Sequence, residues 1–218
     1  MVTRIVLHDR YAWLKNRKAG IGGSDAACII GLNPWKSNIE LWQEKVGLKE
    51  KDSIADSEAV KYGTDAEPLL RELFRLDFPE YDVEYAENNT WSNDRYPFAL
   101  ASLDGWLTDS NGRKGILEIK TSNILQSMQK EKWHDRIPDN YFCQILHYLA
   151  ITEFDFVILK AHLRTVLADG NIFIQTKHYR IERSDVEEDI SYLMQKEEEF
   201  WNENVLKKKQ PALILPQI

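Results

Sequence analysis

Hydrophobic and polar positions alternate between two periods along the chain, and the changes of period divide it into helical and extended segments. Apolar residues at helical spacing predict helices at 9–17, 26–30, 37–47 and 58–77. Alternating positions then predict strands at 83–86, 90–91, 98–107 and 116–121, the last two joined by a turn at 109–112. Helical spacing returns at 124–132 and 139–151, followed by expected strands at 154–163 and 171–181 and a final helix at 184–206.

This order of elements predicts an α/β (α+β) fold in which helices flank a mixed central sheet. Composition shows no break along the 218 residues. We therefore expect a single domain over 1–218, with a core at about 10–206 and a C-terminal tail at 207–218.

Three local signals predict where helices begin. Ser37 with Glu40, and Ser184 with Glu187, have the spacing of a capping box. Pro68 favours a regular helix that begins at this residue, because proline is tolerated in the first helical position.

The predicted strand at 115–122 reads Gly-Ile-Leu-Glu-Ile-Lys-Thr-Ser and carries two charges inside an apolar run. Because side chains alternate along a strand, Glu118 and Lys120 share one face while Leu117 and Ile119 occupy the other. Pairing through the hairpin turn brings Asp104 close to Glu118.

Two converging carboxylates repel each other unless one is protonated or a cation lies between them. Oxygen ligands select a hard divalent ion such as Mg²⁺. Lys120, beside such an ion, can activate a water molecule or neutralise charge on a phosphate. The alternative is a solvated surface group of Asp104, Glu118 and Lys120 with no metal.

A glycine-rich loop, Ala-Gly-Ile-Gly-Gly-Ser-Asp, occupies 19–25. Ser24 and Asp25 are expected to cap the helix that follows, whose free N–H groups suit an anion. Arg17 adds a bidentate donor for a phosphate. The glycines match neither a P-loop nor a dinucleotide fingerprint, and an ordinary capped turn remains the alternative.

The formal net charge of −7 lowers the expectation of a nucleic-acid partner without excluding one, because a local basic groove can coexist with acidic outer faces. No apolar run approaches the ~18–20 residues that span a bilayer, and the N-terminus lacks a signal-peptide pattern. Cys28 and Cys143 are expected to be reduced core thiols. These features predict a cytoplasmic protein that does not enter a membrane.

Asp104 with Glu118-Ile119-Lys120 resembles the PD-(D/E)xK nuclease core, with Leu103 in place of the usual proline. Four further motifs surround it in order: Arg17-Lys-Ala-Gly-Ile-Gly-Gly-Ser24, Leu32-Asn-Pro-Trp-Lys-Ser37, Gly63-Thr-Asp-Ala-Glu67-Pro and Gln144-Ile-Leu-His-Tyr148. Together they resemble the YqaJ-type viral recombinase family, relatives of the phage lambda exonuclease, over residues 10 to 205. The fold that this implies is a restriction-endonuclease-like core.

The resemblance implies roles for the residues of the strand and its neighbours. Asp104, Glu118 and the backbone carbonyl of Ile119 are expected to bind metal, and Lys120 to orient or activate the attacking water. Two more residues are expected to complete the site: Glu67, an acid on the preceding helix, and Gln144, on the helix after the strand. A helix-surface role, with Arg71 as its partner at i+4, is the alternative for Glu67.

The resemblance also implies that Arg17 and Ser24 hold the 5′-phosphate of the digested strand. Four further residues keep two interpretations each. Asp94 is a further site acid or a turn residue, and Trp35 stacks on DNA ends or packs in the core. Tyr148 belongs to the core or the site wall, and His147 lies near the scissile phosphate or away from it.

The implied function is a Mg²⁺-dependent 5′-to-3′ exonuclease of a phage or prophage, with Mn²⁺ as a substitute and one or two ions bound. It would digest one strand of linear double-stranded DNA to leave a 3′ overhang in the bacterial host. Its expected partners are a single-strand annealing protein and two further copies in a homotrimer ring.

Two alternatives to this exonuclease stay open. One is another PD-(D/E)xK endonuclease or repair nuclease, although two distant cysteines cannot supply the four ligands of an iron–sulfur cluster. The other is an inactive module that binds DNA ends or docks a recombinase.

Overall fold

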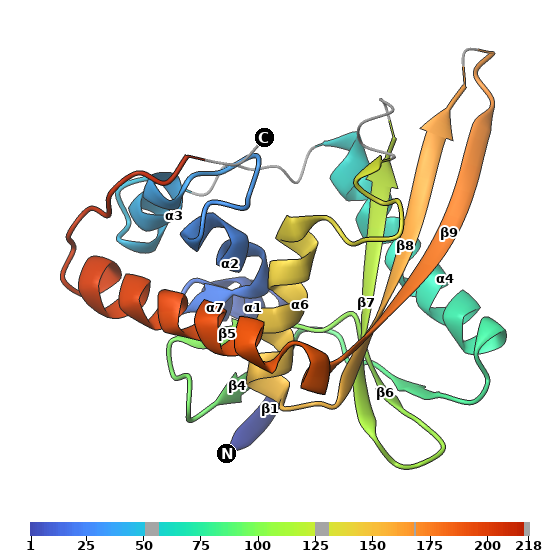
Figure 1. Cartoon of the computed structure of the whole chain (residues 1–218), viewed down its shortest axis with the longest axis horizontal. Coiled ribbons are helices and arrows are strands. Elements are labelled where there is room, and N and C mark those ends of the chain that lie inside the picture. Colours follow the sequence, from blue (N-terminus) through green and yellow to red (C-terminus); the bar gives the residue numbers. More distant parts are fainter. Residues whose placement is uncertain (51–56, 125–130, 168, 216–218) are drawn as a thin grey trace.

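The computed structural model describes residues 1–50, 57–124, 131–167 and 169–215, and it forms two sheets with helices around them (Figure 1). The strands are β1 (Val2–Val6), β2 (Ile21–Gly22), β3 (Asp82–Glu84), β4 (Asn89–Asn93), β5 (Ala99–Ala101), β6 (Gly105–Thr108), β7 (Lys114–Asn123), β8 (Phe156–Val166) and β9 (Ile172–Glu182). The helices are α1 (Arg10–Arg17), α2 (Gly23–Ile29), α3 (Asn38–Lys45), α4 (Glu58–Asp77), α6 (Asp139–Thr152) and α7 (Glu187–Glu199), which continues as a π-helical segment at Phe200–Val205.

The larger sheet has the strand order β3-β6-β7-β8-β9 and is mixed. Its centre is the parallel pair β7–β8, while β6 and β9 run antiparallel to their neighbours. Helix α4 lies on one side of β7, and α6 lies on the other with α7 beyond it (Figure 1). This confirms the expected mixed sheet between helices.

The faces of β7 alternate between two apolar clusters, as the period of the sequence predicts. Leu117 and Ile119 pack with Leu70 and Phe74 of α4. Ile116 belongs to the larger cluster, which contains most of α6 and the buried residues of α2. The charged side chains of β7 therefore lie on the α6 side of the sheet.

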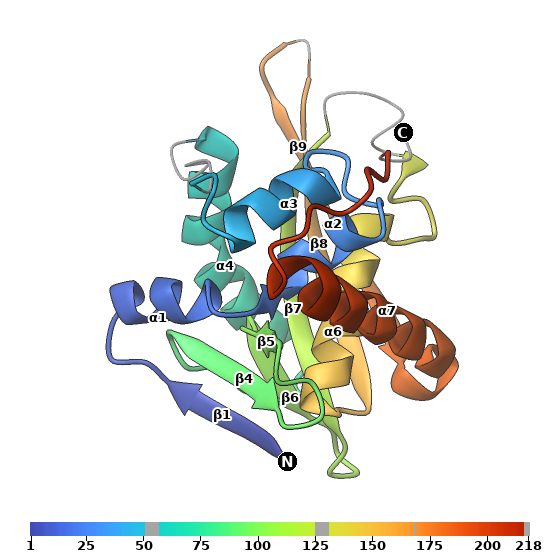
Figure 2. The ribbon, with the colours of Figure 1, turned by 90° about the vertical axis from the view of Figure 1, so that its left-hand side faces the viewer.

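The smaller sheet has the order β1-β4-β5-β2 and stands beside α1 (Figure 2). Neither β1 nor β2 was expected from the sequence, because β1 is largely exposed and β2 contains two residues. The expected strands at 83–86, 90–91 and 98–107 therefore do not share one central sheet, since β4 and β5 belong to a different sheet from β3 and β6.

The expected strand at 98–107 is broken between β5 and β6, and Asp104 lies in the break. The Asn89 side chain stabilises this bend because its amide accepts from the Leu103 N–H at 3.0 Å and donates to the Leu103 carbonyl at 2.9 Å. The strand pattern missed the break because Leu103 is itself buried and continues the alternation.

Two predicted helix starts are wrong. Helix α4 runs without interruption through Pro68 from an N-cap at Ser57, whose side chain accepts from the Val60 N–H. Ser184 lies in a 3₁₀ turn and contacts Asp185 instead of capping α7. The capping box at Ser37 is confirmed. Most of the expected helix at 124–132 lies outside the described residues.

Both cysteines, Cys28 and Cys143, are free and buried, as expected. No helix in the described part of the chain has the length and apolar character needed to cross a membrane.

His147 is fully buried between α6 and α7, and both of its ring nitrogens face acceptor oxygens. Nδ1 lies 2.8 Å from Glu197 Oε1, and Nε2 lies 3.1 Å from the Leu100 carbonyl. Only the imidazolium donates from both nitrogens. Burial opposes this charge, but the Glu197 carboxylate, the Leu100 carbonyl and the Asp25 charge together outweigh it and raise the pKa of His147.

This pair predicts a loss of stability on the alkaline side. Because the folded pKa of His147 is raised, its contribution is complete below the ordinary histidine pKa of about 6.5 and is lost as pH rises through the folded value. As pH increases through the folded pKa of His147, we expect the free energy of unfolding of the wild type to fall more than that of the His147→Gln protein. Denaturant titrations between pH 6 and about 9 measure this. Parallel pH curves for the two proteins would contradict the assignment.

Candidate active site

The open edge of β7 creates the site. Strand β6 begins at Gly105, which pairs with Leu117, so β7 has no β6 partner beyond that point. The Asp104 carboxylate takes this place: its Oδ2 accepts from the Ile119 N–H at 2.9 Å. Since the N–H and C=O of a strand residue point to the same side, the Ile119 carbonyl faces this edge as well.

A hydrogen-bonded network extends from β7 to α6. Glu118 Oε1 lies 2.6 Å from the Lys120 ammonium and accepts from the Gln144 amide at 2.7 Å. The same amide donates to the Tyr148 hydroxyl at 2.9 Å. Glu118 is 1% exposed, and its second oxygen, Oε2, has no partner among the residues that the structure describes.

Glu67 approaches the same edge from α4. Arg71, one turn later and buried, donates to Glu67 Oε1 at 3.1 Å and also to the backbone carbonyl of Asp104. Its guanidinium carbon, Cζ, lies over the Tyr85 ring at 3.5 Å from the ring centre. The i+4 pair that stood as the alternative for Glu67 is therefore present, inside the site and not on a helix surface.

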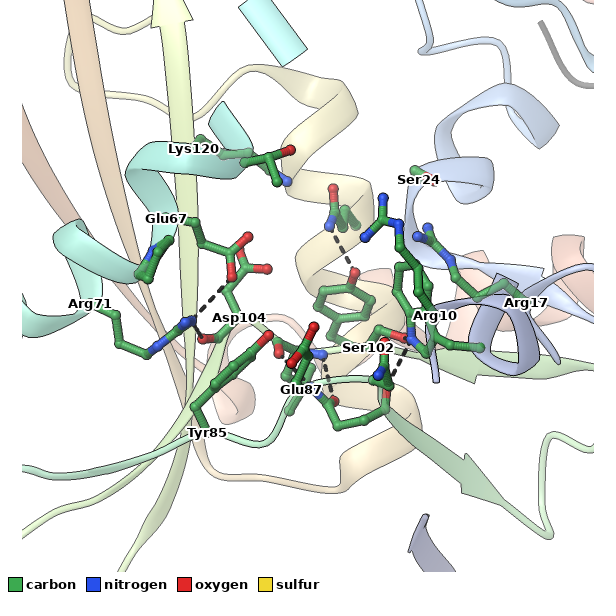
Figure 3. A pocket seen from close by; sticks show the side chains of 18 residues that line it. Arg10, Arg17, Ser24, Glu67, Arg71, Tyr85, Glu87, Ser102, Asp104 and Lys120 are labelled. Carbon is green, nitrogen blue, oxygen red and sulfur yellow. Dashed lines mark hydrogen bonds and ion pairs between the residues drawn. The ribbon is translucent and has the colours of Figure 1, made fainter. Parts of the chain in front are cut away.

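One wall of a cleft with a volume of about 630 Å³ is lined by Glu67, Arg71, Asp104 and Lys120, whereas Glu118 itself is buried. The opposite wall comes from α1 and α2 and carries Arg10, Arg17 and Ser24 (Figure 3). Both guanidinium groups lie over the Trp13 ring, with Cζ at 5.7 Å from the ring centre for Arg10 and 4.5 Å for Arg17. Neither arginine pairs with a carboxylate within the described ranges. The cleft thus has an acidic wall and a basic wall.

Burial and mutual repulsion disturb the acids of the site. Burial, followed by the Asp104 charge, raises the pKa of Glu118 to about 8 and that of Glu67 to about 7. Burial also raises the pKa of Asp104. For Lys120, burial disfavours the charged form, but the Glu118 and Asp104 carboxylates outweigh it and raise the pKa. An added cation at this edge would relieve the repulsion.

The residues fit a divalent ion of the Mg²⁺ type. The buried and unpartnered Oε2 of Glu118, the Asp104 carboxylate and the Ile119 carbonyl supply oxygen ligands of the kind that Mg²⁺ selects. Over the described residues, no group of three His, Cys, Asp or Glu side chains forms a metal cage. Mg²⁺ commonly uses one or two carboxylates and completes its shell with water and substrate phosphates.

The other candidates divide between the cleft and the outside. Tyr148 is buried and lines the cleft. His147 points away from it, into the contact with α7 described above. Asp94 pairs with the N-terminal amine at 3.3 Å on the far end of β4. Trp35 is 73% exposed in the turn before α3, so the expectation of core packing for it is wrong.

Ser24 does not cap α2, which begins at Gly23 with Gly22 as its N-cap, three residues before the expected start. Asp25 does help to cap it, but from the third helical position, where its carboxylate accepts from the Gly22 N–H and pairs with Lys45 at 2.7 Å. Asp25 is therefore turned towards Lys45, and Ser24 remains on the cleft wall.

Sequence reasoning missed several residues of the cleft. Trp13 anchors the basic wall, because its indole N–H is shared between the Asn89 carbonyl and Ser102 Oγ, each at 3.1 Å. A tryptophan between two arginines on one helix was the available signal. Tyr85 and the contact of Arg71 with the Asp104 carbonyl left no local signal.

Comparison with known families identifies the chain. Residues 12–155 match the YqaJ-like viral recombinase domain. The chain belongs to this family. It is 36% identical over 206 residues to the uncharacterized protein YqaJ of Bacillus subtilis, an alignment that covers 94% of the chain. The chain spans 59% of the length of that family member.

Solved structures share the fold of this YqaJ family chain. An alkaline exonuclease from Laribacter hongkongensis matches with a TM-score of 0.66 and 20% identity, over 91% of the chain and 97% of the exonuclease. A phage-related exonuclease from Haemophilus somnus matches with a TM-score of 0.53 and 13% identity, over 87% and 96% of the two chains. These likenesses place the two sheets and their helices in the fold of those exonucleases.

The contact between α2 and α6 predicts the effect of a small substitution. A Cβ atom at Gly23 would lie 2.5 Å from Tyr148 Cε1 and 2.9 Å from Gln144 Cγ. We expect Gly23→Ala to lower the free energy of unfolding by about 1–3 kcal/mol, because both side chains must move. Thermal and denaturant unfolding measure it.

Gly22→Ala is the matched control, since its Cβ would meet the Asp25 carboxylate at an ordinary 3.7 Å. We expect it to stay within about 0.5 kcal/mol of the wild type. Equal effects of the two substitutions would show that the close approach of α2 to α6 does not limit stability.

Proposed function

We propose that the protein is a Mg²⁺-dependent exonuclease that digests one strand of linear duplex DNA from a 5′-phosphorylated end and leaves a 3′ overhang. The observation that carries this proposal is the two-walled cleft. Arg17 and Ser24 stand on one wall, opposite Glu67, Asp104 and Lys120 on the other (Figure 3). The basic wall suits binding of a terminal phosphate, and the acidic wall suits hydrolysis at the next phosphate along the strand.

The reaction is hydrolysis of the P–O3′ bond that follows the terminal nucleotide. A water oxygen bonds to phosphorus, and the O3′ oxygen leaves and takes up a proton, which releases a 5′-mononucleotide. The phosphate stays on the shortened strand as its new 5′ end. Each step thereby regenerates the group that Arg17 and Ser24 are proposed to bind.

The residues of the acidic wall have separate tasks in this proposal. Asp104, Glu118 and the Ile119 carbonyl would hold one or two ions, with Mn²⁺ as a substitute for Mg²⁺. When bound, such an ion polarises the phosphate and lowers the pKa of a coordinated water. Lys120 stabilises the charge that develops on the phosphate oxygens and orients the attacking water.

Two neighbours support Lys120 and the water. Gln144 holds Glu118 Oε1 in the orientation that pairs with Lys120, through its 2.7 Å hydrogen bond. Glu67 contributes an acid at the edge of the cleft and accepts a hydrogen bond from the attacking water.

The biological setting follows the family. We infer a phage or prophage recombination system in a bacterial cytoplasm, a single-strand annealing protein that loads on the 3′ tail, and a homotrimer ring around the DNA. A ring is compatible with the net charge of −7, since the surface that faces the DNA alone needs to be basic. The mass of the protein in solution tests the trimer.

Removing the Lys120 ammonium should abolish most of the activity. We expect Lys120→Met to digest linear duplex DNA about 10²–10⁴-fold more slowly than the wild type, because a charge at the scissile phosphate is lost. Gel or fluorescence assays measure the rate, with EDTA as the metal-free reference. Lys114→Met is the control on the same strand, since Lys114 bonds to Thr108 at the surface. A Lys120→Met protein as fast as wild type would refute the role of Lys120.

The basic wall predicts a preference for phosphorylated ends. We expect faster digestion of a 5′-phosphorylated duplex than of a 5′-hydroxyl duplex, and a reduction of this preference by about tenfold in Arg17→Gln, because a charge-assisted contact is lost. Lys15→Gln, on the exposed side of α1, should keep the preference. Equal rates on both ends in the wild type contradict the phosphate site. Cutting of closed circular DNA would indicate an endonuclease instead.

A further inference from the structure

Arg71 has a place in the site that the proposed chemistry does not use. It is 4% exposed, and a single nitrogen, Nη1, donates to two acceptors from different parts of the chain. One acceptor is Glu67 Oε1, four residues earlier on α4, and the other is the backbone carbonyl of Asp104, in the break between β5 and β6. The guanidinium therefore joins the helix of one site acid to the backbone of another.

Tyr85 fixes the guanidinium from a third direction. The Arg71 carbon Cζ lies 3.5 Å from the centre of the ring, a stacked cation–π contact. Tyr85 lines the cleft, and Figure 3 shows its ring beside Arg71, with the Glu67 carboxylate and Asp104 on the other side. Two hydrogen bonds and one ring contact therefore restrain the orientation of the guanidinium.

On the basis of the proposed function, we propose that Arg71 is a positioning residue that orients the Glu67 carboxylate and holds the Asp104 backbone at the geometry required for the divalent ion. By occupying Oε1 of Glu67, Arg71 leaves the other oxygen for water or metal. By holding the Asp104 carbonyl, it keeps the Asp104 side chain at the open edge of β7. Residues of this kind typically change metal affinity or activity by about 10–100-fold when they are replaced.

The charge of Arg71 and its positioning role have opposite effects on metal affinity, so a binding measurement can distinguish the two. A positive charge beside a cation site repels the cation, so Arg71 acting through charge alone would weaken metal binding. Acting through position, it strengthens metal binding. Lysine keeps the charge but cannot offer a planar group to two acceptors and an aromatic ring together.

Arg75 is a matched control from the same helix. It donates to a carboxylate and a backbone carbonyl as Arg71 does, with Glu72 Oε1 at 2.5 Å and the Val83 carbonyl at 2.6 Å. It lies one turn further on, is 39% exposed, and does not line the cleft. Arg75→Met therefore removes the same kinds of contact without touching the site.

The experiment compares Arg71→Lys, Arg71→Met and Arg75→Met with the wild type. Mn²⁺ binding to the protein alone is measured by the electron paramagnetic resonance signal of the free ion. Digestion of a 5′-phosphorylated duplex gives kcat, KM and the Mg²⁺ concentration for half-maximal rate. Melting temperatures in EDTA report folding, and Arg71→Lys keeps the buried charge if Arg71→Met does not fold.

We expect Arg71→Lys and Arg71→Met each to weaken Mn²⁺ binding and lower kcat by about tenfold or more, with KM for DNA nearly unchanged. Arg75→Met should stay within about twofold of the wild type. The proposal fails if Arg71→Lys matches the wild type, if Arg75→Met is equally impaired, or if Arg71→Met binds Mn²⁺ more tightly.

A different result would contradict the proposed function. A wild type that binds Mn²⁺ but leaves linear duplex DNA intact contradicts the exonuclease. The Mn²⁺ affinity of Arg71→Lys still decides the role of Arg71 in that case.

Discussion

The hydrogen bond from the Ile119 amide to the Asp104 carboxylate marks the point where the central sheet opens. Up to Leu117, strand β6 satisfies the edge of β7, and beyond it a side chain replaces the strand. A buried strand edge without a partner is costly. The Asp104 side chain removes this cost by replacing the missing strand. It also brings a carboxylate to the edge, within reach of Glu118 and Lys120, so the bend at Asp104 shapes both the sheet and the cleft.

Two helices packed on β7 supply the remaining side chains of the site at its open edge. Helix α4 rests on the apolar face of β7 and turns Glu67 and Arg71 towards Asp104, while α6 rests on the opposite face and supplies Gln144. Burial, followed by repulsion from the Asp104 carboxylate, raises the pKa of Glu118 to about 8. The same buried carboxylates thus destabilise the free protein and attract a cation, and a bound ion would remove the destabilisation.

The sequence predicted the parts of the site that depend on local period. Glu118 and Lys120 stand out because they interrupt the alternation of an apolar strand, and α6 is recognisable from its helical spacing. The break at Asp104 could not be predicted, because the buried Leu103 continues the strand pattern across it. The Arg71 contact with the Asp104 carbonyl joins residues 33 positions apart. Such a contact depends on how α4 packs, which no local pattern records.

The two walls of the cleft rest on different apolar clusters. Glu67 and Arg71 lie on α4, which packs on the smaller cluster, whereas Ser24 lies on α2, whose buried apolar residues belong to the larger cluster. Substitutions in one cluster can therefore alter one wall while the other keeps its shape. Within a family built on this plan, the wall proposed to bind the strand end and the wall proposed to cut the strand are free to diverge at different rates.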